Sequence, residues 1–354
     1  MSVNIVETKI ADLKLHIRQV VDGGSLTFEQ AADALDTIMT GQATPAQVAA
    51  LLTALRMRGE TVDEIAGFAS TMRRHALVTE LGDDPRPVVD TCGTGGDGTG
   101  TFNISSTAAF AVSAAGVRVA KHGNRSMTSR CGSADVLEGL GVRIELRPEQ
   151  VARCVNEVGI GFMFAPAFHP AMRHVGPVRR EIGVRTLFNF LGPLTNPAGV
   201  RHQLIGVGDG RVSRNLADVL ARLGSERALV VSSVDGMDEI GVSGESIVVE
   251  YDRGRGGVRE YRVHPEDFGL KVAPRSDLLG GSVEENVAIL RSVLAGDVGA
   301  RRNATLINAG AALYAAGAAE TIAEGIAAAA DAIDSGRAAG RLDALIEMTQ
   351  GMPS

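Results

Sequence analysis

The chain has 354 residues, 45% of them hydrophobic, and carries 42 acidic against 35 basic side chains, for a formal net charge of −7. This length exceeds the usual size of a single hydrophobic core, so two domains or one large domain are expected. The acidic balance argues against a general nucleic-acid-binding protein, because such proteins neutralise phosphates with a basic surface.

The N-terminal residues and the cysteines bear on the cellular compartment. Residues 1–20 place charged and titratable side chains among the apolar ones, which excludes the apolar core of a signal peptide. No apolar run reaches the roughly 18 residues of a membrane span. The cysteines are odd in number and lack metal-ligand spacing, which favours free, buried or partly buried thiols. We therefore expect a cytoplasmic protein with no membrane partner.

The same helix-start signal occurs three times near the N-terminus. A threonine is followed three positions later by glutamine or glutamate in Thr27–Gln30, Thr44–Gln47 and Thr61–Glu64. In such a capping box the two side chains satisfy backbone N–H groups at the start of a helix. The pattern predicts four short helices, whose apolar faces fit either an internal core or a dimer interface. Their expected ranges are about 5–22, 28–40, 45–58 and 62–76.

Prolines and a glycine in Gly82–Pro87 break the helical pattern and mark the expected linker. Beyond it, strands and helices alternate, which predicts a sheet with helices on its faces. The expected strands are 88–90, 117–120, 160–164, 203–208 and 228–233. The expected helices are 103–115, 133–140, 148–158 and 211–223. Residues 167–191 read as helical again, 247–251 with 258–263 as a hairpin, and the last 75 residues as alanine-rich helices.

The stretch from Val88 to Ser133 reads as strand, glycine-rich loop, helix, strand and basic loop. Five glycines between positions 93 and 100 leave backbone N–H groups unshielded by Cβ atoms. Asn103, Ser105 and Ser106 are expected to cap the following helix, whose N-terminal end attracts anions. This unit predicts a binding site for a phosphorylated ligand.

Two common phosphate-binding loops are disfavoured. The glycines match G-x-G-x-x-G, but a dinucleotide site requires an acidic residue at the end of the second strand, where Lys121 and His122 stand. A Walker A loop fails because no Lys-Ser or Lys-Thr follows the glycines. Asp97 inside the loop would repel a bound polyanion unless a metal ion lay between them.

Two further groups of polar residues complete the expected site. Asp238 and Glu239 follow the strand 228–233, at the edge where α/β folds bind ligands, and their oxygens suit magnesium; a solvated acidic turn is the alternative. The loop after the second strand offers cations and hydroxyls to pyrophosphate and to the ribose phosphate. These are Lys121, Asn124, Arg125, Ser126, Thr128, Ser129 and Ser133.

Several long motifs, in register over nearly the whole chain, resemble the anthranilate phosphoribosyltransferase family. They are Asp90–Gly98, Asn103–Ser106, Lys121–Ser126, Val178–Glu181, Phe188–Pro197 and Asp235–Glu239. The resemblance implies transfer of the phosphoribosyl group of 5-phosphoribosyl 1-pyrophosphate (PRPP) to the amine of anthranilate. The products are N-(5-phosphoribosyl)anthranilate and pyrophosphate, in the second step of tryptophan biosynthesis from chorismate.

The family's architecture implies a small all-helical domain and a large α/β domain with a central, mostly parallel sheet flanked by helices. On this chain the small domain is residues 1–82 joined by about 168–192. The large, PRPP-binding domain is 83–167 and 193–354. The resemblance also implies two Mg²⁺ ions per subunit, held by Ser105, Asp238 and Glu239, and a homodimer formed through the N-terminal helical domain.

The resemblance assigns binding residues one by one. For PRPP they are Gly93, Gly96, Asp97, Thr101, Asn103, Ser105, Ser106, Lys121, Asn124 and Ser133, to which the basic loop adds Arg125, Ser126 and Ser129. For anthranilate they are Gly93, Asn124 and Arg179, whose planar guanidinium suits a carboxylate. The basic loop departs from the family at Thr128, Arg130 and Cys131, and only Cys131 loses a good hydrogen-bonding group.

No covalent nucleophile or general base is assigned. His122 is a candidate base, but a histidine beside phosphates is more often an electrostatic or hydrogen-bonding contact, and the amine of anthranilate is already nucleophilic. Two other functional classes of protein remain open as alternatives. A pyrimidine nucleoside phosphorylase is disfavoured by the Gly-Gly-Asp loop and by Asp238-Glu239. A non-catalytic nucleic-acid-binding relative is disfavoured by the acidic net charge.

Overall fold

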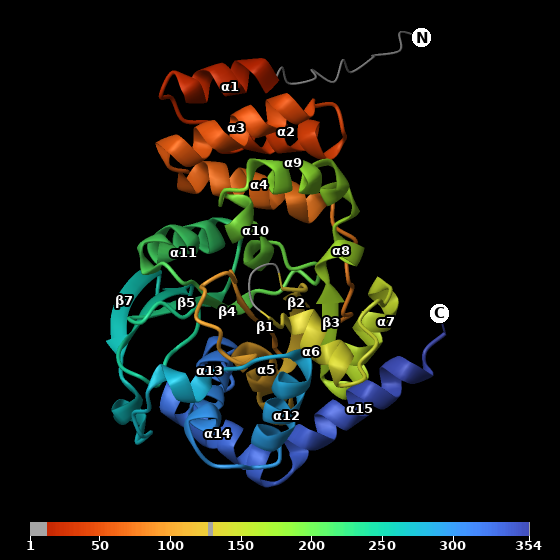
Figure 1. Cartoon of the computed structure of the whole chain (residues 1–354), viewed down its shortest axis with the longest axis vertical. Helices are drawn as coiled ribbons and strands as arrows, with labels where there is room; N and C mark the ends of the chain where they lie inside the picture. Colours follow the sequence, from red (N-terminus) through yellow and green to blue (C-terminus); the bar gives the residue numbers. More distant parts are fainter. Residues whose placement is uncertain (1–12, 127–129, 354) are drawn as a thin grey trace. The chain divides into compact units, whose positions relative to one another are not determined.

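A computed structural model of the chain describes residues 13–126 and 130–353 (Figure 1). The chain divides into two compact units, Met1–Ala76 with His169–Leu191 and Leu77–Phe168 with Gly192–Ser354. The division falls before the expected boundary at residue 82. Backbone bonds tie the segment after Ala76 to the second unit, from Leu77 N to Phe168 O at 2.9 Å and from Thr79 N to Pro197 O at 3.0 Å. No helix in the described ranges is long and apolar enough to cross a membrane.

The first unit consists of helices. They are α1 (Leu13–Val21), α2 (Phe28–Met39), α3 (Pro45–Arg58), α4 (Val62–Arg74), the 3₁₀ turn η2 (Pro170–His174), α9 (Gly176–Ile182) and the start of α10 (Phe188–Leu194). All three predicted capping boxes are present, at the starts of α2, α3 and α4. The expected first helix is seen from Leu13 on, and its earlier residues lie outside the described part of the chain.

One capping box also ties several segments of the helical unit together. Glu64 is fully buried, and its carboxylate accepts hydrogen bonds from Thr61 N at 2.8 Å and from Leu26 N at 2.9 Å. It also pairs with the guanidinium of Arg58 at the end of α3. A buried carboxylate is tolerated only when its charge is paired and hydrogen-bonded, and Glu64 meets both conditions.

Glu64→Ala is expected to destabilise the helical unit by about 3–5 kcal/mol, because it leaves the partly buried Arg58 cation without its carboxylate and two backbone N–H groups without their acceptor. The matched control is Gln47→Ala, which breaks the capping box of α3 at an exposed position. Its expected loss is about 1 kcal/mol. Urea denaturation of both variants, followed by circular dichroism, measures the difference. Equal losses would contradict a role for Glu64 beyond capping.

The second unit is built on a sheet. Within the described residues, seven strands form it in the order β3-β2-β1-β4-β5-β6-β7. They are β1 (Val88–Gly93), β2 (Arg118–Gly123), β3 (Ile160–Phe164), β4 (His202–Gly206), β5 (Arg227–Ser233), β6 (Ser246–Asp252) and β7 (Gly257–Val263). β1 to β5 are mutually parallel, and β6 and β7 add an antiparallel hairpin. The predicted mostly parallel sheet is confirmed.

The second unit also contains helices in addition to the sheet (Figure 1). They are α5 (Ile104–Ala114), α6 (Ser133–Gly139), α7 (Pro148–Arg153) continued by the π-helical turn η1 (Cys154–Val158), α8 (Ala165–Phe168), α11 (Ser213–Arg222), α12 (Val283–Leu294), α13 (Ala300–Ala315), α14 (Ile322–Asp334) and α15 (Arg337–Gly351). Small residues let α13 and α14 approach closely. A Cβ added to Gly310 would lie 2.6 Å from the backbone nitrogen of Ile326. The alanine-rich C-terminal sequence therefore packs as predicted.

Candidate active site

The strand order reverses at the neighbouring strands β1 and β4. β2 and β3 continue the sheet on one side of this pair, and β5 continues it on the other. At such a reversal the loops leaving the two parallel strands diverge, which opens a crevice at their carboxyl ends. The last residues of the two strands, Gly93 and Gly206, are register partners. The expected ligand-binding loops therefore begin at the point where this fold usually holds its ligand.

The paired glycines make room for Asp238. A Cβ on Gly93 would overlap the carboxylate of Asp238, and a Cβ on Gly206 would overlap its backbone carbonyl. Gly95 N donates to Asp238 Oδ2 at 2.8 Å, so the glycine loop also holds the carboxylate directly. Gly206 is not among the predicted site residues, because no motif links a glycine at the end of one strand to a carboxylate after the next.

Carboxylates from two distant parts of the sequence, Asp97 and the pair Asp238-Glu239, meet here. Asp238 N donates to Asp97 Oδ2 at 3.3 Å, and Ser105 N donates to Glu239 Oε1 at 3.1 Å. Burial raises the pKa of both Asp238 and Glu239, and the neighbouring carboxylates, Asp97 for the first and Asp238 for the second, raise it further. The negatively charged forms of both side chains therefore have too little compensating positive charge nearby, and a bound cation would stabilise them.

These groups fit magnesium in the company of a phosphorylated ligand. Their donors are carboxylate oxygens and the Ser105 hydroxyl, the hard ligands that Mg²⁺ prefers. Within the described residues, no three His, Cys, Asp or Glu side chains form a cluster that could hold a metal ion by themselves. Proteins usually hold Mg²⁺ with one or two carboxylates plus substrate phosphates, and this donor set matches that pattern.

The glycine loop itself is shaped by local contacts. Gly95 and Gly96 have φ values of 67° and 69°, which residues with a Cβ rarely adopt. Asp97 accepts from Thr99 N at 3.1 Å and from Thr99 Oγ1 at 2.6 Å, which closes the turn. Thr101 ends the loop in a β-bridge with Leu279. The loop is thus held at both ends, and Gly96, Gly98 and Gly100 are exposed residues within it.

The expected capping of α5 is wrong. Asn103 occupies the N-cap position without a side-chain capping bond, and its Nδ2 donates instead to Cys131 O at 3.2 Å. The Ser106 hydroxyl is buried and makes no hydrogen bond to the described residues. The acceptor for the helix amide of Ser105 comes from Glu239, far away in the sequence. A tertiary carboxylate has replaced the local cap.

Lys121 and His122 are both buried at the end of β2. The Lys121 ammonium donates to the carbonyl of Thr91 and, at 3.3 Å, to Ser105 Oγ. His122 donates from Nδ1 to Gly192 O at 3.0 Å, and burial lowers its pKa. Lys121 thus orients the expected metal-binding hydroxyl, and the hydrogen bond to Gly192 fixes the ring of His122.

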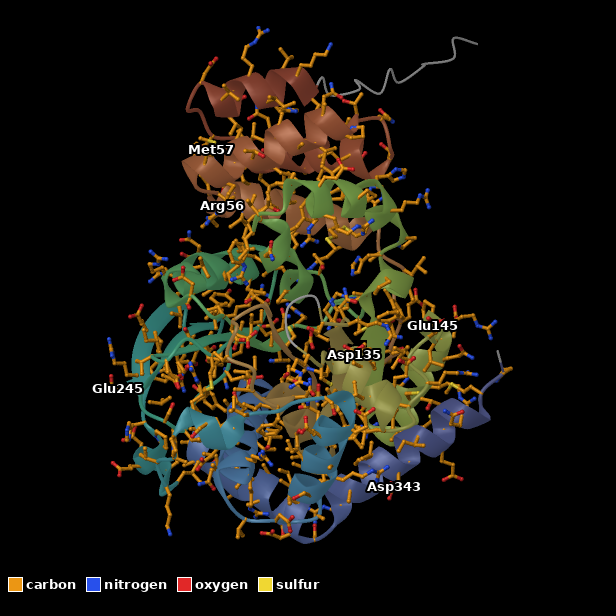
Figure 2. All side chains as sticks on the ribbon, viewed as in Figure 1. Arg56, Met57, Asp135, Glu145, Glu245 and Asp343 are labelled. Carbon is orange, nitrogen blue, oxygen red and sulfur yellow. The ribbon has the colours of Figure 1, made fainter. Side chains whose placement is uncertain are left out.

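The basic loop is organised by Asp135 of α6, which Figure 2 labels. Its carboxylate accepts from Ser126 N at 3.1 Å, from Gly132 N at 2.8 Å and from Arg125 Nη1 at 3.0 Å. Arg125 also pairs with Glu138 at 2.7 Å, so a phosphate would have to compete with two carboxylates for this guanidinium.

The structure describes Asn124 and Cys131, two other residues of this loop that the sequence singles out. Asn124 is exposed, and its carbonyl accepts from Ser133 Oγ at 3.3 Å. Cys131 is buried, and burial raises the pKa of its thiol to about 11, so it is not a reactive thiolate. Thr128 and Ser129 lie outside the described residues.

Arg179 lies on α9 of the helical unit. Its guanidinium carbon lies 5.4 Å from the centre of the Phe188 ring, and burial lowers its pKa. Among the described side chains, no carboxylate pairs with it. A partly buried cation stacked on an aromatic ring provides both features that an aromatic carboxylate needs from a binding site.

Comparisons with known proteins give the family that the chain resembles over most of its length. Residues 14–76 match the helical bundle domain of a glycosyl transferase family, and residues 85–339 match its a/b domain. The anthranilate phosphoribosyltransferase of Moorella thermoacetica is 55% identical over 335 residues, which cover 94% of this chain and 97% of that protein.

Solved structures of two proteins are similar to this chain over nearly their whole length. The crystal structure of anthranilate phosphoribosyltransferase from Thermus thermophilus is similar, with a TM-score of 0.89, 44% identity, and coverage of 95% of this chain and 99% of that one. The enzyme from Saccharomyces cerevisiae in complex with PRPP and Mg has a TM-score of 0.87 and 28% identity, with coverage of 96% and 98%.

Proposed function

The chain belongs to the anthranilate phosphoribosyltransferase family, and on that premise we propose which of its residues perform the reaction. The protein transfers the phosphoribosyl group of PRPP to the amine of anthranilate, releasing pyrophosphate, in tryptophan biosynthesis. The observation that best supports this activity in the fold itself is the seating of Asp238 and Glu239 between the glycine loop and the start of α5.

PRPP is assigned to the loops that follow β1 and β2. Backbone amides of the glycine loop donate to the pyrophosphate, and the polar side chains of both loops bind the remaining oxygens. The residues are Gly93, Gly96, Asp97, Thr101, Asn103, Ser105, Ser106, Lys121, Asn124, Arg125, Ser126, Ser129 and Ser133. Lys121 acts from a buried position by orienting Ser105.

Asp238, Glu239 and Ser105 would hold magnesium, which when bound neutralises charge on the diphosphate leaving group. Two ions per subunit are proposed from the resemblance to the family, with Asp238, Glu239 and Ser105 as the donors from this chain. The protein itself positions the two substrates and stabilises the departing diphosphate, so that no covalent nucleophile is needed. His122 is assigned a hydrogen-bonding role through Nδ1 to Gly192 O, and no general base is assigned.

The activity is tested by following the loss of anthranilate fluorescence after PRPP is added, with and without Mg²⁺. Loss that depends on both PRPP and Mg²⁺ is expected. The carboxylate pair favours this reaction over phosphorolysis, since inorganic phosphate brings no diphosphate for a metal to bridge. Phosphorolysis of a pyrimidine nucleoside, with no reaction of anthranilate, would replace the proposed function.

Arg179→Ala is expected to raise the KM for anthranilate about ten- to a hundredfold and to leave the KM for PRPP nearly unchanged. Removing a charge-assisted hydrogen-bonding partner typically costs ~1.5–3 kcal/mol, which corresponds to that range. Gly93 and Asn124 are assigned to the same substrate. The matched control is Arg180→Ala on the same helix. Steady-state titration of each substrate, with the other in excess, measures the effect, and a loss confined to PRPP would make the carboxylate assignment wrong.

The helical unit and the α/β unit are proposed as the small domain and the PRPP-binding domain, with a homodimer formed through the helical one. Apolar side chains on α1 and α3 support this interface, since Leu15, Val21 and Met57 are 60%, 65% and 84% exposed. Met57 is labelled in Figure 2. Exposed large apolar side chains can contribute to an association surface.

Met57→Lys with Val21→Lys is expected to convert a dimer into a monomer, because it places charges in an apolar interface. Sedimentation velocity at micromolar concentration measures the state of both proteins. A monomeric wild type would refute the proposed dimer.

A cytoplasmic location is also proposed, because Cys92, Cys131 and Cys154 are free thiols, as is usual in a reducing compartment.

A further inference from the structure

Asn308 is a polar side chain in the middle of the alanine-rich helix α13. It is fully buried. Its Oδ1 accepts from Ile240 N at 3.0 Å, and its Nδ2 donates to Ile240 O at 2.9 Å and to Ala304 O at 2.9 Å. One side-chain amide therefore satisfies both backbone polar groups of a single loop residue.

Ile240 directly follows the carboxylate pair Asp238-Glu239. Its side chain is buried, and so is Glu239, so the backbone at this point has little access to water. Buried backbone N–H and C=O groups require hydrogen-bonding partners. Here the side-chain amide of Asn308 takes the place that the backbone of a neighbouring strand would have as the partner of Ile240.

The pair is thus held from two directions. On one side, Gly93 and Gly206 leave only enough space for Asp238, and Gly95 N binds its carboxylate. On the other side, the amide of Asn308 anchors the residue that follows Glu239. Asp238 and Glu239 lie between these two anchored points. The distance between their carboxylates therefore depends on both anchors.

We propose that Asn308 is a positioning residue for the Asp238-Glu239 pair and sets the affinity of that pair for a divalent cation in the presence of PRPP. This inference rests on the proposed function. Asn308 touches the backbone beside the pair and acts through it. A side chain without both a donor and an acceptor would leave at least one polar group of Ile240 buried and unpartnered, and the loop would shift to solvate that group.

The test is Asn308→Leu, which keeps the approximate size of the side chain and removes its polar atoms. The matched control is Thr305→Val on the same helix. Thr305 is also fully buried, and its hydroxyl bonds only within the helix, to Arg301 O at 2.9 Å. Mn²⁺ is titrated into each protein with PRPP present, and free Mn²⁺ is read by electron paramagnetic resonance, so that cation affinity is measured without turnover.

Asn308→Leu is expected to weaken Mn²⁺ binding about 10- to 100-fold, as is typical when a residue supporting the ligands of a metal is lost, and Thr305→Val is expected to leave it unchanged. Turnover of Asn308→Leu should recover as Mg²⁺ is raised. Equal Mn²⁺ affinity in the two variants would overturn the proposal. If Asn308→Leu does not fold, Asn308→Ser takes its place, because its hydroxyl is too short to bond both groups of Ile240.

A failure of the proposed function gives a different result. Wild-type protein that binds Mn²⁺ with PRPP but does not consume anthranilate would refute the transferase activity and leave the role of Asn308 open to the same titration. Wild-type protein that consumes anthranilate, with Asn308→Leu binding Mn²⁺ as tightly as wild type, would refute only the role of Asn308.

Discussion

Replacing Asp238 by Asn and Glu239 by Gln in one variant is expected to lower turnover by at least about two orders of magnitude, the usual effect of losing charge stabilisation in the transition state. The fold should survive. Asn and Gln have nearly the same size as the carboxylates they replace, and an amide oxygen still accepts from Gly95 N and from Ser105 N.

The same variant is expected to be at least as stable as the wild type in the absence of Mg²⁺. Burial and mutual repulsion raise the pKa values of Asp238 and Glu239, so their charged forms destabilise the folded state. Amides remove that penalty. A gain in melting temperature together with a loss of turnover would mark the pair as a functional site that is maintained at the expense of stability.

The matched control removes two carboxylates elsewhere in the same unit, Asp218 and Glu226. Both are in surface ion pairs, with Arg214 and Arg201 respectively. Asp218→Asn with Glu226→Gln makes the same change in net charge and is expected to leave turnover unchanged. Undiminished turnover of the Asp238/Glu239 variant at limiting Mg²⁺ would exclude these residues as metal ligands.

The parts of the fold that were predictable depend on short-range signals. The threonines of the capping boxes act on residues three positions away, so Thr27, Thr44 and Thr61 mark the helix starts correctly. The strands β1 and β5 are short segments between turns or helices, and their alternation with helices is enough to predict a mostly parallel sheet. The binding residues of the site come from the resemblance to a family, and their roles stay a prediction.

The parts that were not predictable depend on contacts between distant residues. Asn103 has the right type for a helix cap, yet Glu239 takes that function once the chain is folded. Arg125 reads as a phosphate-binding cation, yet Asp135 and Glu138 pair with it. Asn308 stands in a segment that reads as packing, and only the folded structure brings it to Ile240. Local patterns contain no information on these partners.

Gly206→Ala is expected to abolish most activity, although Gly206 touches no substrate in the proposed site. Its backbone pairs with β1 and β5, so it cannot move away without breaking the sheet. A Cβ at this position would overlap the carbonyl of Asp238, which must then shift together with its carboxylate. A displacement of about 1 Å in a reacting group typically costs about 100-fold in rate.

The matched control is Gly257→Ala in β7, a strand glycine whose added Cβ would meet no atom within 4 Å. It is expected to leave turnover and stability unchanged, whereas Gly206→Ala should also lose about 1–3 kcal/mol, as is usual for overpacking. Thermal denaturation and steady-state kinetics of both variants separate the two effects. Because Asp238 would be misplaced but still charged, high Mg²⁺ should restore part of the turnover of Gly206→Ala. Wild-type turnover in Gly206→Ala would show that the close approach of Gly206 to Asp238 does not position the carboxylate pair.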